Sequence, residues 1–208
     1  MEIAGRLNGM LRRVPPGLLY PIGMLPAAVL LWQGMTGSLG VDPVKGLEHG
    51  LGKHALQFLI AGLLVTPLRR WTGVNLIRFR RAIGLLAFVY VVLHVLTWAL
   101  LDLQLRWAEI GADLVRRPYI LLGMIGFLAM VPLAATSNNA SVRWLGAAGW
   151  QRLHRLTYVA VLAGAAHYLI LVKAWPPEPI LYAVTAVFLV GLRLLWLRRR
   201  VVLRPAPG

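Results

Sequence analysis

Cysteine is absent from this 208-residue sequence, which excludes disulfides and thiolate-bound metal sites. Acidic residues are scarce: seven Asp and Glu stand against 22 Lys and Arg, which gives a formal net charge of +15. No G-x-G-x-x-G unit follows a predicted strand, so a nicotinamide or flavin-nucleotide domain is not expected. No internal repeat or low-complexity segment stands out. The rest of the composition is dominated by apolar residues.

Long apolar runs place the chain in the membrane. It is 59% hydrophobic with a mean hydropathy of +0.69, far more apolar than a water-soluble domain. A spanning helix needs roughly 20 mostly apolar residues. We predict an all-α polytopic membrane bundle, one domain over residues 1–208, with six transmembrane helices at about 17–33, 54–68, 82–101, 118–136, 155–172 and 179–197. The second is short, and we expect flanking residues to extend it to the interface.

The first of these helices contains Pro21 and Pro26, which indicate a packing kink. No small-residue cleavage site follows it, so we interpret it as a retained helix and not a signal peptide.

The basic residues are distributed unequally between the two sides of the predicted bundle. With the N-terminus in the cytoplasm and alternating helices, six cations lie outside and the other sixteen inside. The six are Lys45, Lys53, Arg106, Arg116, Arg117 and Lys173. All acidic residues except Glu2 lie on the outer side. This excess follows the positive-inside rule, so we predict both termini in the cytoplasm, contact with membrane lipid and no nucleic-acid partner.

Three histidines lie within or beside apolar segments: His94, His154 and His167. Ionisable groups in a membrane helix are costly and by default indicate a functional site. Neutral imidazole is a good axial ligand for heme iron. Because the chain has no cysteine, covalent attachment of a c-type heme is excluded. The pattern therefore predicts a membrane b-type cytochrome, with these histidines as the metal ligands.

The histidine spacing suggests two positions at different depths. His94 follows Arg81 by thirteen residues, and His167 follows His154 by the same interval, about 20 Å along a helix. His94 and His167 then share a depth near the outer face, as a six-coordinate heme requires. His154 meets Arg80 and Arg81 near the inner face. An arginine has no lone pair for iron, so these two are predicted as partners of heme propionates.

That spacing leaves the number of hemes open at one or two. Thirteen steps of about 100° put His154 and His167 roughly 140° apart around an ideal helix. Either the helix bends, or the two residues face different neighbours. His154 either ligates a second heme or only hydrogen-bonds at the start of the helix. Small residues from Ala160 to Ala166 would admit a porphyrin, or would simply allow close helix packing.

Three connecting segments carry further features. Residues 37–54 form a predicted glycine-rich outer loop, in which His49 and His54 are read as solvated or capping side chains. Residues 69–81 form an inner loop whose arginines suit an anionic leaflet. Residues 137–155 form a second inner loop, with Trp144 and Trp150 as interface anchors.

Four long motifs resemble a known family: DPVKGLEHGLGKHALQFLIAGLLVTPL, RFRRAIGLLAFVYVVLHVLTWALL, RRPYILLG and WQRLHRLTYVAVLAGAAHYL. They are similar to the heme-binding membrane subunits of the periplasmic protein-methionine-sulfoxide reductase system, the MsrQ (earlier YedZ) family. The resemblance covers roughly Gly37 to Arg199. The wider superfamily is that of ferric-reductase-like transmembrane domains, which includes the NADPH oxidases. Those oxidases place two histidines on each of two helices, whereas Arg81 stands here where the fourth would be.

The resemblance implies an electron-transfer subunit of an oxidoreductase in the bacterial inner membrane. Family members pass electrons from the quinone pool to a periplasmic molybdopterin-containing reductase, which repairs oxidised methionines. The family's heme-associated histidines fall on His94, His154 and His167, and His49 also matches a family histidine. Some members are described as flavoproteins with FMN, for which we find no recognisable motif here. No catalytic residue is predicted in this chain, because the sulfoxide reduction takes place on the partner.

The chain has no room for a nucleotide-binding domain, so electrons must come from a quinol or from a separate cytoplasmic flavin reductase. Two alternatives differ in function. One is a stand-alone ferric or cupric reductase with the same hemes. The other is a non-redox membrane protein, such as a transporter or assembly factor, in which the histidines are structural; transporters usually show paired repeats, and none is seen here.

Overall fold

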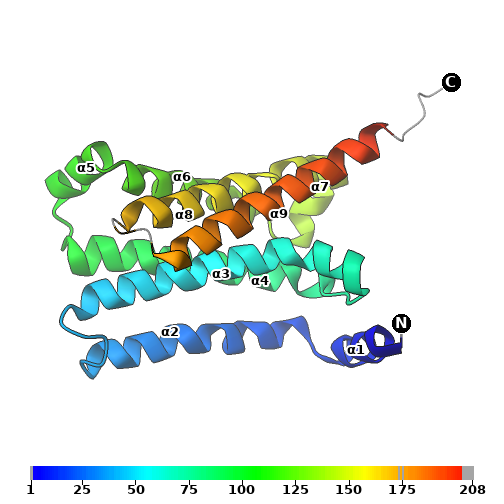
Figure 1. Ribbon diagram of the computed structural model, residues 1–208, viewed down its shortest axis with the longest axis horizontal. Helices are drawn as coiled ribbons and strands as arrows, with labels where there is room; N and C mark the ends of the chain where they lie inside the picture. The colour runs from blue at the N-terminus through cyan, green and yellow to red at the C-terminus, as the bar shows by residue number, and fades with distance from the viewer. Residues whose placement is uncertain (1, 173, 175, 203–208) are drawn as a thin grey trace.

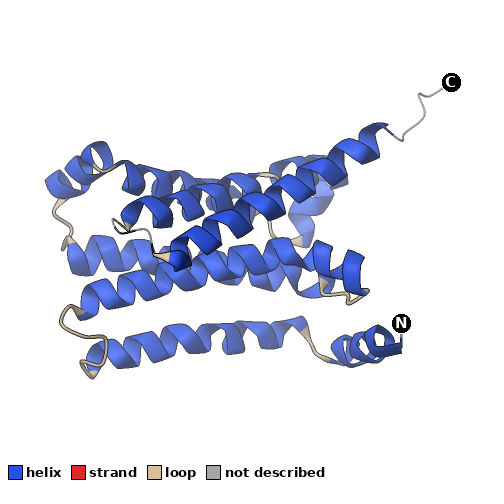
Figure 2. Ribbon diagram, in the orientation of Figure 1, coloured by secondary structure: helices blue, strands red, loops and turns tan. Residues whose placement is uncertain are grey.

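The computed structural model describes residues 2–172, 174 and 176–202, and within them all regular secondary structure is helical (Figures 1 and 2). The α-helices are α1 (Glu2–Arg13), α2 (Leu19–Met35), α3 (Pro43–Thr72), α4 (Arg80–Leu96), α5 (Trp107–Arg116), α6 (Pro118–Ala135), α7 (Asn139–Leu153), α8 (Leu156–Leu171) and α9 (Pro177–Val202). Short 3₁₀ turns precede α2 and α4 at Pro16–Leu18 and Ile77–Phe79. A π-helical segment, Thr97–Asp102, continues α4.

Five helical stretches in the described residues are long and apolar enough to cross a membrane: Pro16–Met35, Pro43–Thr72, Ile77–Asp102, Pro118–Ala135 and Pro177–Arg198. They match five of the six predicted spans, and the all-α class is confirmed. The remaining predicted span, 155–172, coincides with α8, which is apolar but has only 16 residues. The chain is therefore a multi-pass membrane protein.

The prediction of a glycine-rich outer loop is wrong for most of its length. Asp42 caps α3 by accepting a hydrogen bond from the Lys45 backbone N–H at 3.0 Å, and the helix then runs unbroken for 30 residues. Its glycines serve packing and not turns. A Cβ built on Gly50 would lie 2.8 Å from Leu30 Cδ2, so α2 and α3 approach closely there. His49 and His54 consequently lie on a helix.

Other helices were also missed by hydropathy. The predicted inner loop 137–155 is mostly α7, which is kinked at Gly146, where φ is +67°. The predicted inner loop 69–81 begins inside α3 and becomes irregular only at Gly73, where φ is +76°. The short helices α1 and α5 were not predicted, because neither contains a long apolar run.

The carbonyl freed by a proline is paired in α3. Pro67 has no N–H, so the Leu63 carbonyl four residues earlier loses its helical donor. Arg193 Nη2 on α9 donates to that carbonyl at 3.2 Å.

The buried Tyr90 hydroxyl lies between two turns of α2 near Pro26. It donates to the Gly23 carbonyl at 2.7 Å and accepts from the Ala27 N–H at 3.0 Å. This pair of bonds replaces a helical one and ties α2 to α4.

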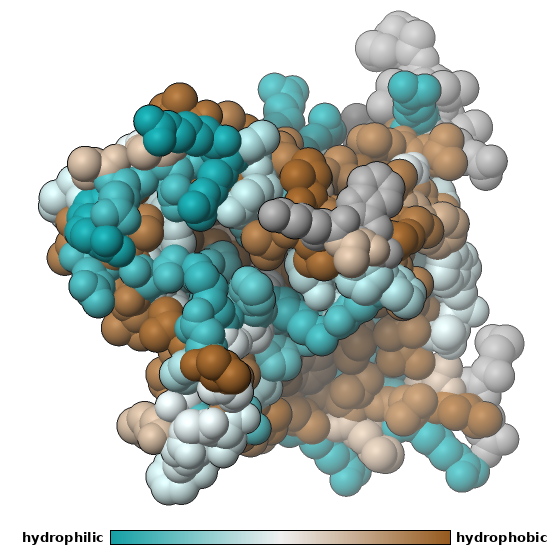
Figure 3. Space-filling view, turned by 60° about the vertical axis from the view of Figure 1, so that its left-hand side comes forward, coloured by the Kyte–Doolittle hydropathy of each residue, from teal (hydrophilic) through white to brown (hydrophobic). Residues whose placement is uncertain are grey.

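The long helices α2, α3, α4, α6, α8 and α9 run lengthwise along the molecule, and the start of α1 and the end of α9 lie at the same end (Figure 1). We call this the α1 end and the opposite one the α5 end. α3 packs along α4, and α6 along α8, with α9 against α8. A central core of Leu, Ile, Val, Ala and Met side chains from α3, α4, α6, α8 and α9 holds the bundle. Figure 3, with the α5 end turned forward, shows hydrophilic residues gathered there beside hydrophobic flanks.

Candidate cofactor site

His94 on α4 and His167 on α8 face each other across the bundle. Their ring centres are 6.1 Å apart, and the ring planes meet at 76°. Two imidazoles that ligate one metal through nitrogens at about 2 Å have ring centres about 6 Å apart. The spacing therefore suits two imidazoles that would hold one heme iron between them.

Each of these rings is held by a backbone carbonyl. His94 Nδ1 lies 2.8 Å from the Glu48 carbonyl oxygen of α3, and His167 Nδ1 lies 2.6 Å from that of Tyr119 on α6. A carbonyl oxygen only accepts, so Nδ1 must carry the proton in both rings. The lone pair is then on Nε2, which is the tautomer required of a metal ligand.

A cavity of about 380 Å³ surrounds the pair. Its walls are mainly apolar and come from α3, α4, α6 and α8. Small residues on three helices line it, namely Gly52, Gly123, Gly126, Ala160 and Gly164. A flat macrocycle can approach the backbone there, so the residues fit a heme. His49 also lines this cavity, from α3 and not from a loop, and its side chain is exposed, as the sequence predicted.

Charged residues surround the cavity at the α5 end, and its cations are already paired. Lys45 Nζ lies 2.6 Å from Asp102 Oδ2 and 3.5 Å from Glu48 Oε2. Arg117 Nε lies 3.1 Å from Asp113 Oδ1. Lys53 is bonded to Glu178. Arg106 pairs with Glu109 in the same way, so four of the predicted outer cations meet outer acids, while Lys173 lies outside the described residues.

His154 is not on the helix of His167, contrary to the spacing argument. It is the C-cap of α7, and α8 begins two residues later. Because the chain turns there, the calculated angle of 140° does not apply. Its ring stacks on Trp150 with centres 3.7 Å apart, and its Nε2 lies 3.2 Å from Thr136 Oγ1. Burial, followed by the positive charge of Arg80, lowers the pKa of His154 to about 4, so the ring is neutral at neutral pH.

The two predicted arginines differ in their surroundings. Arg81 Nη2 donates to Asn139 Oδ1 at 2.8 Å, so its guanidinium is engaged by α7. Arg80 lies close enough to His154, Tyr158 and Arg193 to interact with them electrostatically. None of His154, Arg80 and Arg81 lines the cavity around His94. The structure therefore separates the two predicted positions.

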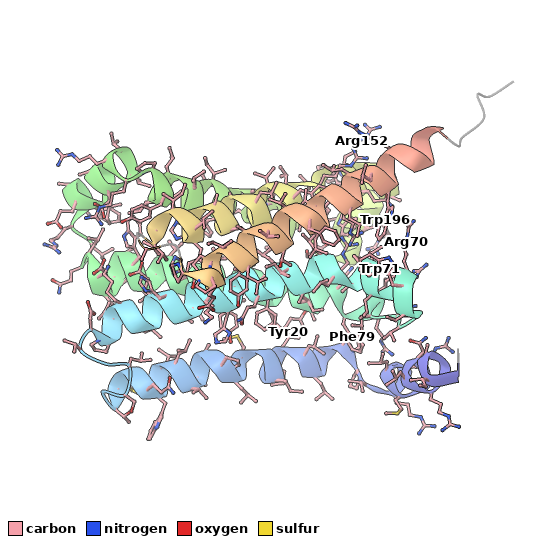
Figure 4. The ribbon with its side chains drawn as sticks, in the orientation of Figure 1. Tyr20, Arg70, Trp71, Phe79, Arg152 and Trp196 are labelled. Carbon is pink, nitrogen blue, oxygen red and sulfur yellow. The ribbon has the colours of Figure 1, made fainter. Side chains whose placement is uncertain are left out.

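Sequence reasoning missed the part that Arg193 plays at the α1 end. Its Nε is buried, and no hydrogen-bond partner for it lies within the described residues. Arg70 stacks over Trp196 nearby, 4.0 Å from the ring centre (Figure 4). All described acids except Glu2 lie toward the α5 end. The cluster of Arg70 and Arg193 therefore has no acidic side chain from that set beside it and would suit an anionic group. A lone arginine within an apolar run was the available signal.

The donor set does not suit a metal ion held by side chains alone. No three His, Asp or Glu side chains in the described part of the chain gather closely enough to hold one. Two facing imidazoles in an apolar bundle instead fit a heme held between transmembrane helices. Residues 50–165 match the family described as the ferric reductase like transmembrane component.

Relatives give the particular family. The chain is 50% identical over 187 residues, 90% of this chain and 83% of the relative, to proteins from Brucella ovis, Brucella suis and Brucella melitensis. Each is named protein-methionine-sulfoxide reductase heme-binding subunit MsrQ. The chain belongs to the MsrQ family, as its motifs predicted.

Proposed function

We propose that this chain is the heme-binding electron-transfer subunit of a protein-methionine-sulfoxide reductase. The observation that carries the proposal is the facing pair of His94 and His167, whose rings stand at the separation that two ligands of one iron require. A heme b bound there supplies reversible one-electron transfer. The protein tunes it through the two imidazoles, their carbonyl partners and the apolar walls.

The orientation follows from charge. α8 serves as the sixth span, and both termini lie in the cytoplasm of a bacterium with the bundle in its inner membrane. The α1 end, rich in arginine, then faces the cytoplasm, in keeping with the positive-inside rule. The α5 end, with six of the seven acids, faces the periplasm.

Electrons enter from a quinol or from a cytoplasmic flavin reductase. They leave at the α5 end, where the charged side chains of Lys45 and Glu48 line the cavity of His94 and His167. The acceptor is a periplasmic molybdopterin-containing methionine-sulfoxide reductase, which repairs oxidised proteins. We propose no site for FMN.

At the α1 end we propose a second heme, with His154 as a ligand. Three observations support it: the imidazole is neutral, Arg80 stands close by, and the buried Nε of Arg193 has no partner among the described residues. Propionates would pair with Arg80 and Arg193. Arg81 would act at this site only indirectly, because its guanidinium donates a hydrogen bond to Asn139 of α7.

The test is a reduced-minus-oxidised visible spectrum of the purified membrane protein and of single variants of His94 and His167, which we call the outer pair. We expect a b-type spectrum in wild type and loss of most outer-heme absorbance in His94→Ala and His167→Ala, while both variants still insert. His54→Ala is the control, because that histidine bonds Gln57 and does not line the cavity.

Full heme retention in both variants would refute the ligand pair, and a wild type without heme would support a non-redox protein. The match to the ferric reductase family favours one other candidate function, a stand-alone ferric reductase. Reduction of chelated iron at the outer face by the purified protein, without a partner, would indicate a stand-alone reductase.

A further inference from the structure

The two histidines of the outer pair share a detail of packing on different helices. His94 Nδ1 donates to the carbonyl of Glu48, and four residues after Glu48 comes Gly52. His167 Nδ1 donates to the carbonyl of Tyr119, and four residues after Tyr119 comes Gly123. The same arrangement of carbonyl, three residues and glycine thus meets each ring, once on α3 and once on α6.

Both glycines leave the space beside an imidazole free of a side chain. A Cβ built on Gly52 would lie 3.1 Å from His94 Nδ1 and 3.2 Å from its Cε1. A Cβ built on Gly123 would lie 3.0 Å from His167 Nδ1 and 3.3 Å from its Cε1. Optimal contacts between such atoms are about 3.5–4.0 Å. Any side chain at either position would push the ring away from its carbonyl.

Helix geometry explains why the glycine stands at this offset. Each Cα–Cβ bond of an α-helix tilts toward the N-terminus, so a side chain at one position stands over the carbonyl four residues earlier. That carbonyl already accepts the helical N–H, and its second lone pair can accept another donor only if it is accessible. A glycine four residues later uncovers it.

Neither glycine is demanded by its backbone. Positive φ values occur elsewhere, at Gly37, Gly40, Gly73 and Gly146, whereas Gly52 and Gly123 lie inside regular helices. Glycine costs about 1 kcal/mol relative to alanine in a helix interior, so its use there calls for a reason in packing. The contact with the ring is that reason.

We propose that Gly52 and Gly123 are positioning residues that seat the two heme ligands. Each lets an imidazole donate its Nδ1–H to a backbone carbonyl, which aims Nε2 at the iron and makes the ligand more basic. A more basic ligand favours the oxidised iron and lowers the reduction potential of the heme. This inference rests on the proposed function, since it requires that the pair ligate a heme.

The test compares Gly52→Ala and Gly123→Ala with wild type in the purified full-length protein. We expect a rise in the midpoint potential of the outer heme in each variant and changed low-spin electron paramagnetic resonance g values. Both report the ligand bond and not the amount of folded protein. The double variant should show a larger rise than either single variant, because the two rings are seated independently.

Control variants distinguish the proposed positioning of the imidazoles from other effects of replacing a glycine. Gly62→Ala lies on the same helix as Gly52, and its Cβ would meet only Ile83 Cγ2 at 3.7 Å. Gly84→Ala meets nothing within 4 Å. Both should leave potential and g values unchanged. Gly164→Ala lines the cavity away from either ring, with Leu56 Cδ1 at 3.8 Å, so it tests crowding of the porphyrin alone.

A second measurement covers the case in which the alanine variants do not assemble. In wild type, pulsed electron paramagnetic resonance should detect one exchangeable Nδ1 proton on each ligand ring, and the signal of that proton should disappear in D₂O. Absence of those protons overturns the inference. So do alanine variants of Gly52 and Gly123 that bind heme with the wild-type potential and g values. A wild type without heme overturns the proposed function as well, and the other two results leave it intact.

Discussion

At the scale of single residues, the chemistry depends on which nitrogen of each histidine is free. In the outer pair, Nδ1 is taken by a carbonyl and Nε2 is left for a metal. His154 differs, because its Nε2 lies near the hydroxyl of Thr136 and its ring stacks on Trp150. A ligand role for His154 therefore requires that this weak contact of 3.2 Å be exchanged for iron.

Heme stoichiometry tests that role. We expect His154→Ala to lower the heme content of the purified protein from about two to about one per polypeptide, because the inner iron loses its imidazole. The residual spectrum should be that of the outer heme. Pyridine hemochrome analysis against protein concentration gives the number, and His54→Ala serves as the control.

An equal content of one heme in wild type and His154→Ala, with the same spectra and redox titrations, would show that the protein holds a single heme. His154 would then only hydrogen-bond at the end of α7.

At the scale of elements, α3 shows how a proline is tolerated in a membrane helix. Pro67 frees the Leu63 carbonyl, and Arg193 of α9 donates to it. The charged Arg193 within the apolar part of α9 thus supplies the hydrogen bond that Pro67 removes from α3. The same helix carries His49, the carbonyl of Glu48 and Gly52, so its unbroken N-terminal half positions the outer site.

A double-mutant cycle tests the pairing of Arg193 with Pro67. We expect Arg193→Met to destabilise the protein by about 1 kcal/mol, because a buried carbonyl loses its donor. In a Pro67→Ala background the backbone N–H of Ala at this position reaches the Leu63 carbonyl, so the same substitution should cost close to nothing. Thermal unfolding in detergent, followed by circular dichroism, measures both.

Equal losses of stability in the two backgrounds would show that Arg193 acts through other contacts. Heme content measured on the same samples reports separately on its proposed role beside a propionate.

At the scale of the whole molecule, charge separates the two ends. The arginines of the α3–α4 connection, α7 and the end of α9 gather at the α1 end, where Arg70 and Arg152 are seen (Figure 4). The acids gather at the other end in ion pairs such as Lys45–Asp102. By the positive-inside rule, such a distribution supports the proposed orientation, with the arginine-rich end on the cytoplasmic side.

Reporter fusions test the orientation. Alkaline phosphatase joined to the C-terminus should be inactive, since the enzyme requires the periplasm, and the same fusion within 107–116 should be active. Green fluorescent protein at the two positions should give the opposite pattern, which checks that each fusion is made. An active C-terminal phosphatase would reverse the proposed topology.

Particular residues show how far prediction from the sequence reached. The apolar runs predicted the membrane class and six spans, five of which coincide with helices long enough to cross a membrane, because hydropathy depends on composition alone. The matched intervals before His94 and His167 predicted that these two meet, and the structure brings them together. The outer loop was wrong, because glycines such as Gly50 can indicate either a turn or close packing, and only the neighbouring helix decides between them.

By itself, the sequence determined that this protein is a helical membrane bundle of the MsrQ family, and it predicted His94 and His167 at one depth and His154 at another. Tertiary structure alone decided how those histidines are held. The carbonyls that accept from His94 and His167 lie 46 and 48 positions earlier in the chain, on other helices. Such partners are chosen by the way α3 packs on α4 and α6 on α8, and that packing depends on shape and not on local pattern. For the same reason the break before α8, which removes His154 from the helix of His167, could not be read from an apolar run.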